Sequence, residues 1–240
     1  MQQRLAKYIA RTGVCSRRQA EEYIIQQRIS VNGHIIVTPA FNVNGDEQIT
    51  LDGEKLPEIK QTMLFLYYKP TGLVTTHKDE KGRQTVFDIL PQNLPRLISV
   101  GRLDLNSEGL LLLTNNGELS RELELPKNAW SRKYRVRVHG KIEKEKLQNL
   151  EGGVTIDGIS YGKVSITIDQ QIGTNTWLTV TLNEGKNREI RKLMKFIGLD
   201  VARLIRVSYG PFQLGNLKKG EIRQVPQKVL KEQLGGRFKL

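Results

Sequence analysis

The chain has 240 residues, of which 38% are hydrophobic and 26% charged, so it can build a substantial core and is not broadly disordered. Its formal net charge of +13 favours a polyanionic partner such as nucleic acid. The longest aliphatic run, residues 110–113, is far too short to span a membrane, and a single cysteine excludes an intrachain disulfide and fits a reducing cytoplasm. One cysteine and three scattered histidines offer no metal-ligand spacing, so no metal site is predicted.

Residues 1–60 predict two short helices followed by a small sheet. An apolar stripe ends before Gly13, which predicts a helix stop, and Ser16 with Gln19 has the spacing of a capping box that opens a second helix. The stretches "ISVNGHIIV" and "QITLDGEKL" are strand-like, and their Asn-Gly and Asp-Gly pairs are strong turn signals.

The helical part of this unit is basic, and its cations are candidates for contact with RNA phosphates: Arg4, Lys7, Arg11, Arg17 and Arg18. On charge alone, a solvated helix face is the alternative, and the basic start also matches an organellar transit peptide. The stretch "RLAKYIARTGVCSRRQAEEYIIQQRISVNG" resembles the S4-like RNA-binding domains. This resemblance implies binding of structured RNA as an accessory to another domain. We therefore expect an S4-like domain over residues 1–60, with a linker that starts near residue 53.

Residues 61–230 contain more strand-like than helical segments. Helices are expected only at 118–125, 143–150 and 187–197, and several strands follow one another with no helix between them. This order favours an α+β domain with a mixed or largely antiparallel sheet over a doubly wound parallel one. Residues 231–240 are expected to form a basic C-terminal tail.

A lone carboxylate in this domain, Asp104, stands between two leucines in "GRLDLNSEGLLLLT". The neighbouring leucines should face the core, so the carboxylate is expected to be partly desolvated and to need a cation. Arg102, Arg191 and Arg206 are candidate partners in segments with apolar flanks. The residues alone leave two interpretations open, a reactive group or a cap for the turn before the apolar run.

The helix expected at 187–197 carries both apolar and basic residues. Its exposed face presents cations that could meet an RNA backbone: Arg188, Lys192 and Lys195. Arg191 falls between the two faces, where its stem can follow the core edge and its guanidinium can reach a partly buried carboxylate. A boundary arginine that only reaches solvent is the alternative.

Several spaced motifs of residues 64–213 resemble the RsuA/RluB-type ribosomal RNA pseudouridine synthases. They occur in the expected order: "YYKPTGLVTT", "GRLDLNSEGLLLLTNNGEL", "KYRVRV", "LNEGKNREIRKLMKFIG" and "RLIRVSYGPF". Together with the S4-like domain they cover nearly the whole chain. The fuller set is closer to the RluB type, which acts on large-subunit ribosomal RNA, than to the RsuA type, which acts on the small subunit.

The resemblance implies roles for individual residues of this chain. Asp104 matches the catalytic aspartate of the family, Tyr134 the active-site tyrosine that packs on uracil, and Arg191 the basic residue paired with the aspartate. Arg102 matches an arginine that helps to displace the target nucleotide, and Leu204 an apolar residue of the pocket wall. On residues alone, Tyr134 would be an ordinary strand residue and Leu204 part of the core.

The implied reaction is the isomerisation of a uridine to pseudouridine, which needs no cofactor because it involves no net redox change. Asp104 would either attack the ribose or remove a ribose proton to give a glycal, and the sequence does not choose between these routes. We expect a cytoplasmic monomer whose partner is ribosomal RNA or a ribosomal assembly intermediate. The alternatives are a non-catalytic RNA-binding assembly factor, the same chemistry on small-subunit ribosomal RNA, and, more remotely, the same chemistry on transfer RNA.

Overall fold

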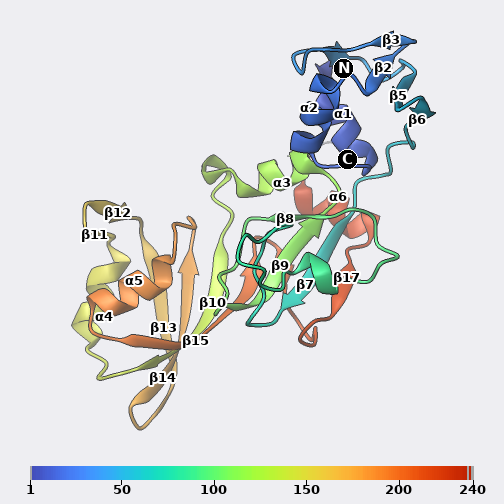
Figure 1. Ribbon diagram of the computed structural model, residues 1–240. Coiled ribbons are helices and arrows are strands. Elements are labelled where there is room, and N and C mark those ends of the chain that lie inside the picture. The colour runs from blue at the N-terminus through green and yellow to red at the C-terminus, as the bar shows by residue number, and fades with distance from the viewer. Residues whose placement is uncertain (1, 237, 239–240) are drawn as a thin grey trace.

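The computed structural model describes residues 2–236 and 238, and its N-terminal domain joins two helices to a small sheet (Figure 1). The four-stranded sheet has the order β3-β2-β5-β6, and β1 pairs with β4. This arrangement confirms the predicted helix–turn–helix followed by strands. The helices are α1 (Leu5–Thr12) and α2 (Arg17–Ile25), and the strands are β1 (Gln3–Arg4), β2 (Ile29–Val31), β3 (His34–Ile35), β4 (Asn42–Val43), β5 (Ile49–Leu51) and β6 (Glu54–Lys55).

Local residue choices explain where these elements begin and end. Gly13 follows α1 in the left-handed conformation with φ of 89°, which ends the helix. Ser16 and Gln19 make both hydrogen bonds of the capping box at the start of α2. The two predicted hairpin turns have both central residues at positive φ, as type I′ turns require: Asn32-Gly33 and Asp52-Gly53.

The larger domain is built on one nine-stranded sheet with the main strand order β13-β14-β10-β15-β9-β7-β17. Strand β8 also pairs with β9, and β16 with β15. Within this sheet, only the β15–β9 pairing is parallel among the described residues. A mixed sheet with few helices is the predicted α+β architecture. The strands are β7 (Leu64–Lys69), β8 (Ile98–Val100), β9 (Glu108–Thr114), β10 (Arg132–His139), β13 (Val164–Ile172), β14 (Asn175–Leu182), β15 (Asp200–Tyr209), β16 (Phe212–Gln213) and β17 (Ile222–Gln224), with a separate hairpin of β11 (Val154–Ile156) and β12 (Ile159–Tyr161).

The helices of this domain are α3 (Gly117–Glu124), α4 (Lys144–Glu151), α5 (Glu189–Phe196) and α6 (Gln227–Leu234), with short 3-10 turns at Phe87–Ile89 and Pro126–Asn128. The first three confirm the predicted helices. The prediction of a tail from residue 231 is wrong in its first part, because α6 buries Leu230 and Leu234 at helical spacing. Residues 237, 239 and 240 of that tail lie outside the described residues. None of the described helices is both long and apolar enough to cross a bilayer.

Two apolar clusters lie on the two faces of the large sheet. The first joins Val136 of β10 to Leu147 of α4 and Leu193 of α5. The second joins Leu112 of β9 to Leu230 of α6. The first face therefore carries α4 and α5, and the second carries α6 behind β7 and β9.

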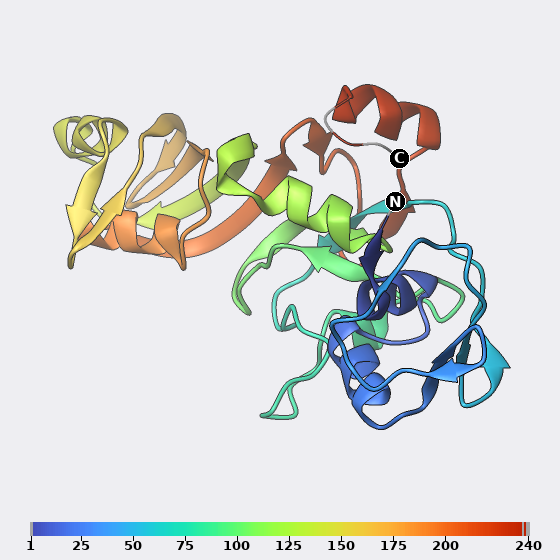
Figure 2. The same ribbon diagram turned by 90° about the horizontal axis from the view of Figure 1, so that it is seen from above.

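The N-terminal domain packs at one end of the sheet, and α4, α5 and the β11–β14 strands lie at the other (Figures 1 and 2). Two basic side chains of α1 make the junction. Lys7 forms an ion pair with Glu118 in the first turn of α3, and Arg11 donates to Thr62 Oγ1 at 2.8 Å and to the carbonyl of Asn115 at 3.1 Å. These contacts orient the N-terminal domain on the larger one.

Candidate active site

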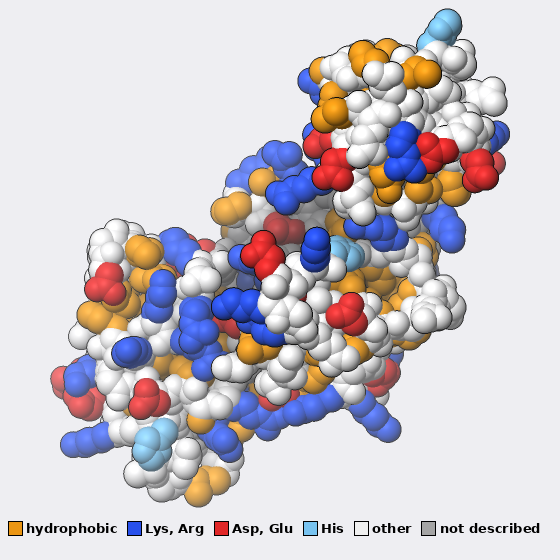
Figure 3. Space-filling view, viewed as in Figure 1, with side chains coloured by type: hydrophobic (Ala, Val, Ile, Leu, Met, Phe, Trp, Pro, Cys, Tyr) orange, Lys and Arg blue, Asp and Glu red, His pale blue; other side chains and the backbone are white. Residues whose placement is uncertain are grey.

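A cleft of about 510 Å³ opens on the sheet face that carries α5. Its walls come from the loop 101–107, from β10 and β15, and from the segment 184–190 that leads into α5. The structure brings five of the predicted site residues together there: Arg102, Asp104, Tyr134, Arg188 and Leu204. Figure 3 shows Lys and Arg side chains on both sides of a hollow in the middle of the face seen in that view.

The loop that carries Asp104 is held through its backbone by Lys69, at the end of β7. The Lys69 side chain is fully buried, and its Nζ donates to the carbonyls of Asp104 at 3.1 Å, Ser107 at 3.0 Å and Pro70 at 3.0 Å. Burial lowers the pKa of Lys69 to about 8. Lys69 is not among the predicted site residues, although a lysine before proline at the end of an apolar strand is a visible signal.

The cation that lies beside the Asp104 carboxylate is not the predicted Arg191. Arg188 Nη1 lies 3.9 Å from Asp104 Oδ2, and the Asp104 side chain is 36% exposed. Arg188 precedes α5 with a left-handed φ of 52°, which a helical wheel cannot represent. The carboxylate is thus partly solvated and has an arginine at its side.

Arg191 instead braces the backbone around the cleft, so the predicted pairing of its guanidinium with Asp104 is wrong. Its Nη2 donates to the carbonyl of Asn106 at 2.8 Å, and its Nη1 donates to that of Val201 at 3.1 Å. Burial lowers the pKa of Arg191, the nearby Arg188 lowers it further, and Asp104 acts in the opposite direction. Arg191 therefore influences Asp104 through its loop and its charge rather than by contact.

One wall of the cleft is formed by two adjacent strands. Tyr134 and Leu204 are buried on β10 and β15, on the face that holds the first apolar cluster. Arg206, opposite Tyr134 in the β10–β15 register, is also buried and lines the cleft. Its Nε donates to the carbonyl of Leu110 at 2.7 Å, whereas its Nη2 has no hydrogen-bond partner among the described residues. Arg206 thus keeps an unused donor group beside the cleft.

The segment before α5 is pinned by two glutamates that the sequence analysis did not select. Glu184 accepts from the backbone N–H of Gly162 at 2.7 Å and pairs with Lys186 Nζ at 2.6 Å. Buried Glu189 accepts from the backbone N–H of Lys186 at 2.9 Å. Burial raises the pKa of Glu189 to about 7, and nearby Glu184 adds to the rise. These contacts fix the segment that presents Arg188 to the cleft.

The predicted RNA-binding cations fall into two groups. Lys7 and Arg11 are engaged in the junction between the domains, and Arg4 donates to the carbonyl of Ala40. The remaining side chains are at least partly open to solvent: Arg17, Arg18, Arg188, Lys192 and Lys195. Glu118, in the first turn of α3, holds Lys7 in this junction.

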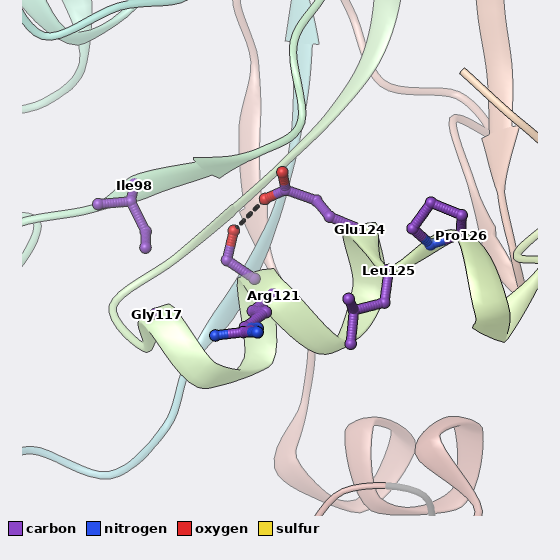
Figure 4. A pocket seen from close by; sticks show the side chains of 7 residues that line it. Ile98, Gly117, Arg121, Glu124, Leu125 and Pro126 are labelled. Carbon is purple, nitrogen blue, oxygen red and sulfur yellow. Dashed lines mark hydrogen bonds between the residues drawn. The ribbon is translucent and has the colours of Figure 1, made fainter. Parts of the chain in front are cut away.

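The cleft continues along α3. A second hollow of about 350 Å³ is lined by α3 residues and shares Glu124 and Pro126 with the cleft. Figure 4 shows this hollow, in which Glu124 Oε1 accepts from Ser120 Oγ at 2.6 Å. Glu118, in the first turn of the same helix, contacts Lys7 of the N-terminal domain.

Comparisons with known proteins agree with this division into two domains. The sequence profile of the RNA pseudouridylate synthase family matches residues 63–196, and that of the S4 domain matches residues 3–49. An uncharacterized RNA pseudouridine synthase of Rickettsia felis is 48% identical over 96% of this chain and its own full length. The ribosomal large subunit pseudouridine synthase B of Yersinia pestis is 41% identical over 92% of this chain and 70% of its own length. A crystal structure of a pseudouridylate synthase, 26% identical, covers 96% of this chain and 99% of its own, with a TM-score of 0.67.

Proposed function

This chain belongs to the family of RNA pseudouridylate synthases, and we propose that the uridine it converts to pseudouridine lies in large-subunit ribosomal RNA. The likeness to the large-subunit enzyme of Yersinia pestis supports this choice of substrate. The observation that carries the catalytic assignment is the meeting of Asp104, Tyr134 and Leu204 in one cleft. We propose that the chain acts as a monomer in the cytoplasm, on ribosomal RNA or an assembling subunit.

The reaction rearranges bonds without net oxidation. The N1–C1′ bond breaks, a C5–C1′ bond forms, and the proton lost from C5 is matched by one gained at N1. A uridine within structured RNA must first leave its stack, at a cost of a few kcal/mol. In the proposed complex, Arg102 fills the space that the nucleotide vacates, Tyr134 packs on the uracil, and Leu204 closes the wall behind it.

Asp104 is the proposed catalytic group, because its carboxylate lines the cleft and stays partly hydrated beside Arg188. It acts on the ribose either as a nucleophile at C1′ or as a base at C2′. Lys69 and Arg191 are positioning residues, since both hold carbonyls of the loop that carries Asp104. The route at the ribose can be tested with deuterium at C2′, which slows only the proton-abstraction route.

The RNA is proposed to reach the cleft along α3, between the two domains. The hollow along α3 shares Glu124 and Pro126 with the cleft, and Arg17 and Arg18 are exposed on the S4-like domain. Lys192 and Lys195 lie on α5, at the opposite end of the large sheet from the S4-like domain. Contacts of this kind depend on phosphate charge, so RNA affinity is expected to fall steeply as salt rises.

The test is carbodiimide mapping of pseudouridine in ribosomal RNA from cells that lack this protein. Wild type should restore one large-subunit site and Asp104→Asn should not, although both bind the RNA within a few-fold. Asp157→Asn is the matched control, because Asp157 is an exposed turn residue with a left-handed φ of 51° that asparagine tolerates. Restoration by Asp104→Asn would refute the catalytic assignment, and a lost site in small-subunit RNA would refute the substrate. A protein that binds RNA but restores no site would be a non-catalytic assembly factor.

A further inference from the structure

One half of the large sheet has an uncovered face. The second apolar cluster, which covers the back of β7 and β9, includes no described residue of β10, β13 or β14. The opposite face of these three strands carries the first cluster with α4 and α5. The back of β10, β13 and β14 is therefore open to solvent.

Strand alternation fills this open face with cations around one aromatic ring. On β10, buried Tyr134, Val136 and Val138 alternate with exposed side chains that point the other way: Lys133, Arg135, Arg137 and His139. Arg137 lies between Trp177 of β14 and Arg203 of β15 in the strand register. We call Arg135, Arg137, Trp177 and Arg203 the arginine–tryptophan face.

Three guanidinium groups of this face lie over or beside the same indole. The Cζ atoms of Arg135, Arg137 and Arg203 are 4.8, 6.0 and 6.0 Å from the centroid of the Trp177 ring. The side chain of Arg135 is 48% exposed, so it can turn from the indole toward a phosphate without disturbing the core. The side chain of Arg203 is 38% exposed and is held by Glu108 through its Nε. Cation–π contacts at exposed sites contribute only about 0.5–1 kcal/mol each, so they do not lock the arginines in place.

The carboxylates near this face are fewer than its cations, so the net charge of the face stays positive. Asp169 lies 3.7 Å from Arg135 and accepts from Thr179 Oγ1 at 2.9 Å. Glu108 is almost fully buried and pairs with both Arg203 and Lys219. Burial alone would raise the pKa of Glu108, but hydrogen bonds and charge from these two cations lower it below its ordinary value. Glu108 therefore belongs to this side of the sheet and not to the cleft of Asp104.

We propose that the arginine–tryptophan face binds a single-stranded segment of the RNA substrate, with a base stacked on Trp177 and flanking phosphates held by the arginines. An aromatic ring on an open sheet surface, surrounded by cations, is the chemistry that captures unpaired bases. A double helix keeps its bases stacked and would leave the indole unused. The inference requires an RNA substrate for this family member but does not depend on which uridine is modified.

The experiment measures binding of the full chain to labelled oligouridylate and oligoadenylate of about 12 nucleotides by fluorescence polarisation, over a range of salt. Trp177→Leu should weaken binding about tenfold, because a stacked base is worth roughly 1–3 kcal/mol. Trp177→Phe should restore most of the affinity, which a purely structural role of the indole would not predict. Arg135→Gln with Arg137→Gln should reduce the slope of log affinity against log salt by about 1.4, the equivalent of two single-strand phosphates.

The matched control is Lys144→Gln with Lys163→Gln, which removes two exposed cations of the same domain that are not part of the arginine–tryptophan face. If Trp177→Leu and the double arginine variant bind both oligonucleotides as this control does, the proposal is wrong. The face would then be merely solvated or would meet an acidic protein. Pseudouridine formation in a short hairpin that reaches only the cleft should be equal in all variants. A wild-type chain that leaves every hairpin unmodified would contradict the proposed function, whereas the polarisation result would still decide the role of the face.

Discussion

Replacement of Lys69 by methionine tests whether a buried ammonium group holds the loop of Asp104 in place. Methionine keeps the apolar stem and most of the volume but removes the donor to the carbonyls of Pro70, Asp104 and Ser107. We expect Lys69→Met to lose both stability and turnover while it keeps its affinity for RNA, since Lys69 is fully buried and does not face solvent.

The magnitude follows from two opposing contributions. Burial lowers the pKa of Lys69 from 10.5 to about 8, which corresponds to a desolvation cost of roughly 3 kcal/mol for the charged form. Each hydrogen bond to a charged group contributes about 1.5–3 kcal/mol, so three of them exceed that cost. The variant also leaves one buried and two partly buried carbonyls without their donor. We expect the free energy of unfolding to fall by about 3 kcal/mol.

The expected loss of turnover comes from the position of Asp104. A displacement of the reacting group by about 1 Å can cost on the order of 100-fold in rate, so the single-turnover rate of Lys69→Met should fall by about that factor. Urea unfolding and pseudouridine formation on one RNA hairpin measure the two effects. Lys141→Met, at an exposed lysine, is the control. A Lys69→Met rate within threefold of wild type, or an unfolding free energy within about 1 kcal/mol of it, would refute the positioning role.

Two further predictions concern the segment before α5. The pKa of Glu189, raised to about 7 by burial and by Glu184, lies above its unfolded value, so the free energy of unfolding should fall by on the order of 2 kcal/mol as pH rises from about 4.5 to 7. Glu189→Gln should remove most of this decline in urea midpoints measured at pH 5 and pH 8, and an unchanged slope would contradict the assignment. Arg188→Gln should lower the single-turnover rate with little effect on unfolding, whereas Arg191→Gln should lower both, because only Arg191 braces the carbonyls of Asn106 and Val201. Equal stability losses in the two variants would show that this division of roles is wrong.

Local sequence signals predicted those parts of the fold that a few neighbouring residues determine. The capping box of Ser16 and Gln19 and the two turns with paired positive φ values need no distant contact, and the structure contains all of them. The third predicted helix of the larger domain likewise follows from its own apolar stripe. Such features depend on backbone geometry within one or two turns of chain.

Other features depended on long-range packing and were missed or misplaced. A helical wheel placed Arg191 toward the carboxylate. The left-handed backbone at Arg188 instead brings the guanidinium of Arg188 to Asp104. Lys69 acquires its role only when a loop about 35 residues later folds over it. Alternation along β9 does predict the direction of the Glu108 side chain, because it places Glu108 on the same face as Leu110 and away from the cleft.

Gly109 shows how a backbone position, rather than a side chain, assembles the cleft. It lies opposite Arg206 in the parallel pairing of β9 and β15, with φ of 105°, and a Cβ atom there would stand 2.3 Å from the Arg206 carbonyl oxygen. Only glycine allows this approach, since that contact is with backbone, which cannot swing aside as a side chain can. The close approach sets β15, with Leu204, beside the strand that begins just after the Asp104 loop. The glycine that follows Glu108 therefore brings together two walls of the cleft that lie almost 100 residues apart in the chain.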